Sequence, residues 1–140
     1  MIRDSMKTAA VAMLSCVLAA CAAQQPETAQ SNDTGIDVEG IIIRNALAYT
    51  VKDVMVEVPA TGGFAGCGNI LPRSECRTSF QAVGYQQNAL LVSWSEHGEA
   101  RGTDEFKVKL PQGVGPGDTV WLEVIIYAPG LAGARLIQPE

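Results

Sequence analysis

Histidine and positive charge are both scarce in this chain. Its 140 residues contain one histidine, and 10 Lys and Arg are outnumbered by 15 Asp and Glu, which gives a formal net charge of −5 at pH 7. The basic residues are scattered singly along the sequence. Because a positively charged surface supplies most of the affinity for a phosphate backbone, we expect no nucleic-acid partner.

A long hydrophobic run is also missing. The most apolar stretch, residues 8–20, is too short to anchor the chain across a bilayer, since a spanning helix takes about 20 apolar residues. Lys7 precedes this stretch, and a positive start before a short apolar segment is typical of a secretory signal peptide. Asp4 does not fit such a start, so we interpret Met6 rather than Met1 as the initiator.

The apolar stretch ends in Leu18-Ala19-Ala20-Cys21, an aliphatic residue and two small residues before a cysteine. This sequence resembles the lipobox of bacterial lipoproteins. The resemblance implies a signal peptide of residues 1–20, cleavage before Cys21, and attachment of diacylglycerol and palmitate to that cysteine. In such lipoproteins an Asp directly after the modified cysteine prevents sorting to the outer membrane. This chain has Ala22 at that position, so the resemblance implies sorting to the outer membrane, facing the periplasm. Several acyl chains make such attachment nearly permanent.

The segment behind the cysteine is polar and has no large apolar side chain before Ile36. Such a stretch buries too little apolar surface to offset the conformational entropy that ordering would cost. We therefore predict that residues 21–35 are the lipidated cysteine and a flexible tether. Removal of the signal peptide leaves 140 − 20 = 120 residues, which suits a single domain. We place that domain at residues 36–140.

Cysteine is too scarce for a zinc site. Cys16 lies within the apolar N-terminal run and Cys21 ends it, which leaves Cys67 and Cys76 in the body of the chain. Two cysteines a few residues apart in an exported protein form a disulfide by default, and here it would staple one hairpin or loop. His97 is then the one ligand left of the three or four that zinc requires. We predict a Cys67–Cys76 disulfide, no metal and no other cofactor.

Beyond Ile36, short apolar runs alternate with Gly, Pro and Asn, a pattern that favours β-strands. Every second residue is apolar in four runs, which predicts inward-facing rows. These rows are Val54, Val56 and Val58; Leu90, Val92 and Trp94; Phe106, Val108 and Leu110; and Val120, Leu122, Val124 and Ile126. Shorter candidates lie at residues 41–43 and 134–137, and the segments around Cys67 and at 78–83 are expected to pair as a hairpin.

Seven or eight strands at this spacing predict an antiparallel β-sandwich. The segment Ile43–Val54 resembles the opening hairpin of immunoglobulin-like or fibronectin-like bacterial domains, and Pro116–Val120 resembles the turn before one of their late strands. This resemblance implies an immunoglobulin-like sandwich.

Motifs of catalysis are missing too. The chain has no Gly-x-Ser-x-Gly, and Ser93 and Ser95 lie too near His97 in sequence for a serine, an imidazole and a carboxylate to align. The glycine-rich segment at 61–68 lacks the lysine of a phosphate loop. Four acidic residues offer oxygen ligands without the spacing of a calcium loop: Glu96, Glu99, Asp104 and Glu105.

The late strand carries apolar residues on its second face as well. Trp121, Ile125 and Tyr127 lie opposite the inward row, interrupted by Glu123. Either a loop or the C-terminal residues cover this face, or it is an exposed aromatic patch that docks a partner.

We therefore expect a non-enzymatic lipoprotein with an interaction or structural role in the cell envelope, whose partner docks on Trp121, Ile125 and Tyr127. The alternative is a module that binds a small ligand or glycan, in which Trp94 or Trp121 stacks on a ring together with Tyr85 or Tyr127. A third hypothesis, an envelope hydrolase, would need His97 in a pocket beside a nucleophile.

Overall fold

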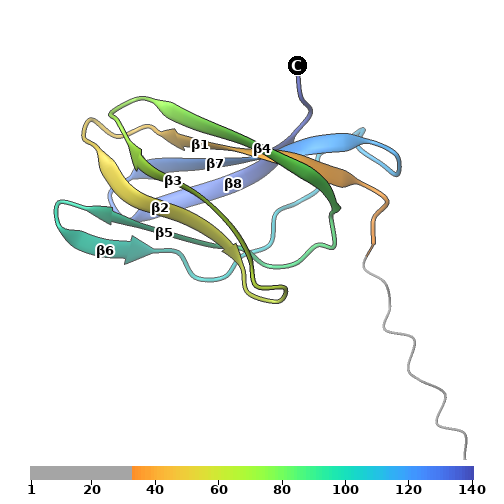
Figure 1. Ribbon diagram of the computed structural model, residues 1–140, viewed down its shortest axis with the longest axis horizontal. Helices are drawn as coiled ribbons and strands as arrows, with labels where there is room; N and C mark the ends of the chain where they lie inside the picture. Colours follow the sequence, from red (N-terminus) through yellow and green to blue (C-terminus); the bar gives the residue numbers. More distant parts are fainter. Residues whose placement is uncertain (1–32) are drawn as a thin grey trace, which may run out of the picture.

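The structure, a computed structural model, describes residues 33–140. Two four-stranded sheets pack face to face in this part of the chain (Figure 1), with the strand orders β4-β1-β7-β8 and β3-β2-β5-β6. The predicted all-β sandwich of seven or eight strands is confirmed. The strands are β1 (Asp37–Asn45), β2 (Val51–Val58), β3 (Gly63–Ile70), β4 (Glu75–Gly84), β5 (Leu91–Glu96), β6 (Glu99–Gly102), β7 (Thr119–Ala128) and β8 (Leu131–Ile137).

The predicted signal peptide and Cys21 lie outside the described residues, as does most of the predicted tether. Its last residues, Thr34 and Gly35, are bonded to the sandwich: the Thr34 hydroxyl donates to the Tyr85 carbonyl at 2.8 Å, and the Gly35 carbonyl accepts from the Gly117 amide at 2.8 Å. The domain therefore includes at least two residues before Ile36.

One strand pair is not antiparallel. β1 runs parallel to β7 along its whole length, whereas the other neighbours in both sheets are antiparallel. The expected hairpin at Ile43–Val54 is wrong, because β1 and β2 belong to different sheets and the chain crosses between them at residues 46–50. The immunoglobulin-like subtype stays a prediction.

Asn45 holds this crossover in place. Its buried side-chain amide donates to the carbonyls of Tyr49, Ile70 and Leu71 at 2.7–3.1 Å, and its carbonyl accepts from the Leu47 amide at 3.0 Å. A buried amide satisfied in this way fixes the loop and the end of β3 relative to each other.

Alternating apolar side chains form the core between the sheets, as three of the predicted rows require. Buried members of these rows are Val54 and Val56 from β2, Leu90, Val92 and Trp94 from β5 and the residue before it, and Val120, Val124 and Ile126 from β7. The core has two parts, one around Ile43, Val51 and Ile126, and one around Ile36, Val108 and Leu136 near the N-terminal end of the domain.

The remaining predicted row, Phe106, Val108 and Leu110, is not a strand. Only Phe106 pairs with a neighbour, in an isolated bridge to Leu90, and Leu110 is exposed. The alternating pattern correctly predicts that Phe106 and Val108 face inward, but their backbone is not part of a sheet. The Val108 carbonyl instead accepts a hydrogen bond from the Tyr85 hydroxyl at 2.6 Å. Side-chain periodicity reports burial, whereas a strand also needs a neighbouring backbone to bond with.

The predicted disulfide forms between Cys67 and Cys76, with a Cα–Cα distance of 6.1 Å. Of the two predicted settings for this bridge, a hairpin or a loop, the hairpin is wrong, because β3 and β4 do not pair with each other. Cys67 lies on β3, which pairs with β2, and Cys76 lies on β4, which pairs with β1, so the bridge joins the edge strands of the two sheets. The connection at residues 71–74 crosses from one sheet to the other instead of closing a two-stranded ribbon.

Candidate functional site

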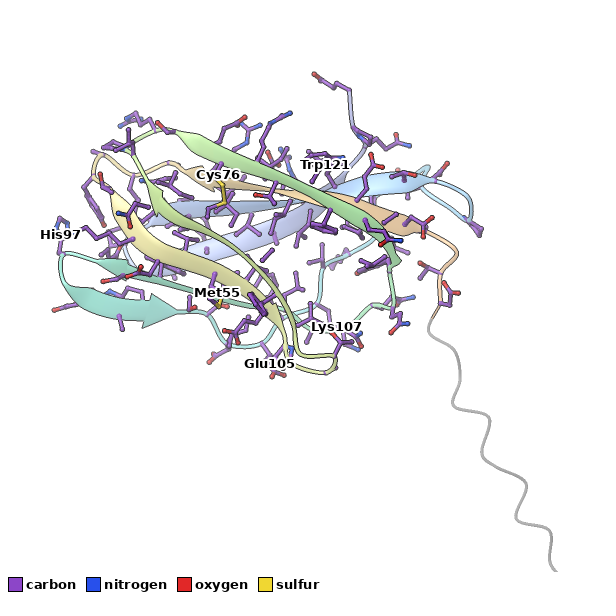
Figure 2. The ribbon with its side chains drawn as sticks, viewed as in Figure 1. Met55, Cys76, His97, Glu105, Lys107 and Trp121 are labelled. Atoms are coloured by element: carbon purple, nitrogen blue, oxygen red, sulfur yellow. A yellow bond between two sulfur atoms is a disulfide. The ribbon has the colours of Figure 1, made fainter. Side chains whose placement is uncertain are left out.

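The edge strands β3 and β4 meet at one end of the sandwich and separate toward the other. Figure 1 shows them close together where the chain passes from β3 to β4 and splayed apart near the β2–β3 turn. The disulfide, drawn beside the label of Cys76 in Figure 2, lies at the closed end. The sheets are therefore fastened at one end of this edge and open at the other.

An apolar cleft occupies the open end. It has a volume of about 470 Å³, within the range of pockets that bind small molecules, and both sheets contribute to its walls. Buried side chains form the deep wall, among them Val38, Val56, Leu90, Val108 and Leu136. No Asp, Glu, Lys, Arg or His of the described residues lines it.

Three large apolar side chains of the edge strands remain exposed at the cleft. Phe64 of β3 is 73% exposed, and Phe80 and Val83 of β4 are 38% and 54% exposed, although all three line the cleft. The β3 side contributes mainly small residues beside Phe64, namely Gly63 and Ala65, so little fills the space opposite β4. Exposed apolar groups around a concave site are typical of a binding surface.

Tyr85 closes the end of the cleft nearest the start of the domain. Its hydroxyl donates to the Val108 carbonyl, and its amide donates to the Ile36 carbonyl at 2.7 Å. Burial raises the pKa of the Tyr85 phenol above its ordinary value of 10.0. Tyr85 is also the residue to which Thr34 is bonded, which brings the N-terminal segment of the domain to the cleft.

The residues predicted to dock a partner lie on the outer face of the β4-β1-β7-β8 sheet, away from the cleft between the sheets. Trp121 (Figure 2) is half-buried: its ring lies over Gly40 on β1, and its indole N–H donates to a Glu39 carboxylate oxygen at 3.2 Å. Ile125 is half-buried and Tyr127 is 56% exposed.

Glu123 separates Trp121 from the other two. Its carboxylate is 2% exposed and accepts hydrogen bonds from Arg44 on β1, at 2.6 Å, and from Arg135 on β8. Burial alone would raise the pKa of Glu123, but the two arginines outweigh it and lower the pKa below 4.5. This face therefore carries an ion-pair network between its apolar residues and is not one aromatic patch.

A second buried carboxylate, Glu96, lies at the end of the sandwich opposite the cleft, where β5 ends. Glu96 accepts from the Tyr49 hydroxyl at 3.0 Å and the Gly130 amide at 2.8 Å, and it pairs with Arg101 at 3.0 Å. Burial raises its pKa, but these hydrogen bonds and the arginine together lower the pKa below 4.5. The network fastens the β5–β6 turn to the β7–β8 turn.

His97 lies in the β5–β6 turn at this end (Figure 2). It is exposed, and its ring stacks at a tilt on Tyr49 with 4.1 Å between centroids. Trp94, the other candidate for ring stacking, is buried in the core. Among residues 33–140, no group of three or more His, Cys, Asp or Glu is placed to hold a metal ion, and no helix could span a membrane.

Comparison with known proteins adds little. No protein-family model matches the chain, and no curated protein matches it. A solved structure described as "NMR structure of the protein from Eubacterium rectale" is similar over 73% of this chain and 90% of its own, with 15% identity and a TM-score of 0.44. A similarity of this size assigns no function.

Of the residues predicted to dock a partner or to stack on a ligand, Tyr85 alone lines the cleft. Phe64, Phe80 and Val83 were missed, because an apolar residue in a strand is normally assigned to the core. The available signal was the run of small residues on β3, the strand that carries Phe64 and lies opposite Phe80 and Val83 of β4.

Proposed function

We propose that this protein is a lipid-anchored envelope protein, cleaved before Cys21 and held on the outer membrane facing the periplasm, with a non-catalytic interaction module behind the anchor. The motif Leu18-Ala19-Ala20-Cys21 after a short apolar segment carries the anchoring proposal. The cross-sheet disulfide supports it, because such bonds persist in exported proteins.

Metabolic labelling tests the anchor. Cells that express the chain are fed an alkyne analogue of palmitate, and the protein is recovered and its label measured. We expect label in the wild type and in Cys16→Ser, and none in Cys21→Ser. Equal labelling of the wild type and Cys21→Ser, or no labelling at all, would refute the proposal.

Binding of a small ligand is the second candidate, and the apolar cleft favours it. Stacking on the predicted rings does not fit this cleft, since Trp94 is in the core and Trp121 and Tyr127 lie on the outer face of the β4-β1-β7-β8 sheet. A ligand in the cleft would contact aliphatic walls with Tyr85 at one end.

A further inference from the structure

The walls of the cleft change character with depth. The buried wall is aliphatic, formed by residues such as Val38, Val56 and Leu136, whereas the polar residues are exposed (Thr61 and Gln86) or half-buried (Asn88 and Tyr85). We propose that the cleft binds one acyl chain of a membrane lipid, with the chain inside and the head group at the polar mouth. This inference deepens the ligand-binding candidate above by naming the class of ligand.

The lining decides between ligand classes. A hydrocarbon chain gains free energy for each methylene that leaves water, and it needs no hydrogen-bond partner in the wall. A glycan would have to leave hydroxyl groups unsatisfied against the aliphatic wall, and a charged group would lose its hydration without a counter-charge. Phe64 and Phe80, at the opening edge, extend the apolar surface out to solvent.

The source of the acyl chain follows from where the domain begins. A Cβ atom on Gly84, a residue of the cleft, would lie 3.8 Å from the Asp33 carboxylate, and Thr34 is bonded to Tyr85. The chain that leads to Cys21 thus leaves from the cleft end. Residues 21–32 span at most about 40 Å at 3.3 Å per residue. If Cys21 is lipidated as proposed, the cleft stays within reach of the bilayer surface.

Photocrosslinking tests the proposal. The complete protein is placed in phosphatidylcholine vesicles in which a small fraction of the lipid carries a diazirine in one acyl chain, and crosslinked peptides are identified by mass spectrometry after irradiation. We expect label on the tryptic peptide of residues 78–101, which contains Phe80, Val83 and Tyr85. Val83→Trp should reduce this label roughly tenfold or more, because contact with two buried methylenes already corresponds to that factor.

Leu131→Trp is the matched control, since Leu131 is also about half exposed but does not line the cleft. Circular dichroism checks that each variant folds. Ala65→Phe, which obstructs the cleft from the opposite wall, replaces Val83→Trp if that variant does not fold.

Label spread over the outer faces, or equal label in Val83→Trp and wild type, would overturn the proposal. So would a wild-type dimer that Val83→Trp dissociates without any lipid label, since a second copy would then occupy the cleft. A chain that starts at Ala22 carries no lipid of its own. If this chain were labelled and the lipidated protein were not, the proposal would also be overturned, because the protein's own lipid would then fill the cleft. Failure of palmitate incorporation at Cys21, measured separately, refutes the anchor and not the cleft.

Discussion

The ring of Trp121 lies directly over Gly40 on the neighbouring strand, so close that a Cβ atom on Gly40 would be 2.6 Å from its carbon atoms. A real Cβ does not approach an aromatic ring so closely. The two residues are partners in the parallel register of β1 and β7. Glycine at this position therefore makes room for the indole on the outer face of the sheet.

Gly40→Ala should destabilise the domain by about 1–3 kcal/mol, because the ring must move and its hydrogen bond to Glu39 is strained. Urea denaturation followed by fluorescence measures the change. Gly115→Ala is the control: nothing lies within 4 Å of its Cβ position, so its effect should stay within about 0.5 kcal/mol. Equal effects of the two substitutions would contradict this account of Gly40.

Acid should weaken the fold through its two buried carboxylates. The pKa values of Glu96 and Glu123 are lowered from 4.5 in the folded state, so their stabilising contribution is complete above that pH and is lost as the pH falls toward the folded values. Glu123→Gln should lower the unfolding free energy at pH 7 by about 1–3 kcal/mol. It should also make stability less dependent on pH below 4.5.

Unfolding free energies measured from pH 7 down to pH 3 check this prediction. Glu105→Gln, at an exposed position, should follow the wild-type curve. If Glu123→Gln followed that curve as well, the arginine pair would contribute nothing to stability.

Asn45→Leu should cost about 2–4 kcal/mol, because three carbonyls and one amide lose their partner at a buried crossover. Thermal and urea denaturation both report the loss. Asn69→Leu, at an exposed position of β3, should change stability by less than about 0.5 kcal/mol. A neutral Asn45→Leu would mean that the crossover finds other partners.

Reduction of the Cys67–Cys76 bridge should destabilise the domain by about 2–3 kcal/mol in the chain-entropy account. Denaturation with and without a reducing agent measures this difference. The double variant Cys67→Ala/Cys76→Ala should be less stable by a similar amount and insensitive to the reductant. A reductant effect on the double variant would have a cause other than this bridge.

Tyr127 is the best remaining probe of the predicted partner-docking face, because it is exposed and lies outside the Glu123 network. If a partner docks there, crosslinking in the native envelope followed by mass spectrometry should recover it with the wild type and lose it with Tyr127→Ala and Trp121→Ala. Leu71→Ala, exposed in the β3–β4 connection, is the control. A partner retained by both aromatic variants does not use this face.

The sequence predicts the sandwich well and its connections poorly. Period-two burial on β2, β5 and β7 follows from local alternation, and the disulfide follows from two available cysteines. Whether Cys67 and Cys76 join one sheet or two depends on how the chain turns at residues 71–74, and no local pattern encodes that choice. Likewise Phe106 and Val108 are inward-facing without belonging to a strand.

The candidate site was the least predictable part. Phe80 and Val83 have the residue types of a core, yet both are exposed on β4, the edge strand that separates from β3. Such a separation is a property of how two sheets pack at one edge, which involves residues far apart in the sequence. Tyr85 was singled out as an aromatic ring for stacking, whereas in the structure it closes the end of an aliphatic cleft.

The parallel pair of β1 and β7 also governs when this domain can fold. β1 ends at Asn45 and β7 begins at Thr119, yet they are neighbours in the centre of one sheet. A partly synthesised chain that lacks β7 leaves one edge of β1 without its neighbour, so this sheet cannot be completed until residues 119–128 have emerged. Pairings between such distant segments form slowly, typically in milliseconds to seconds.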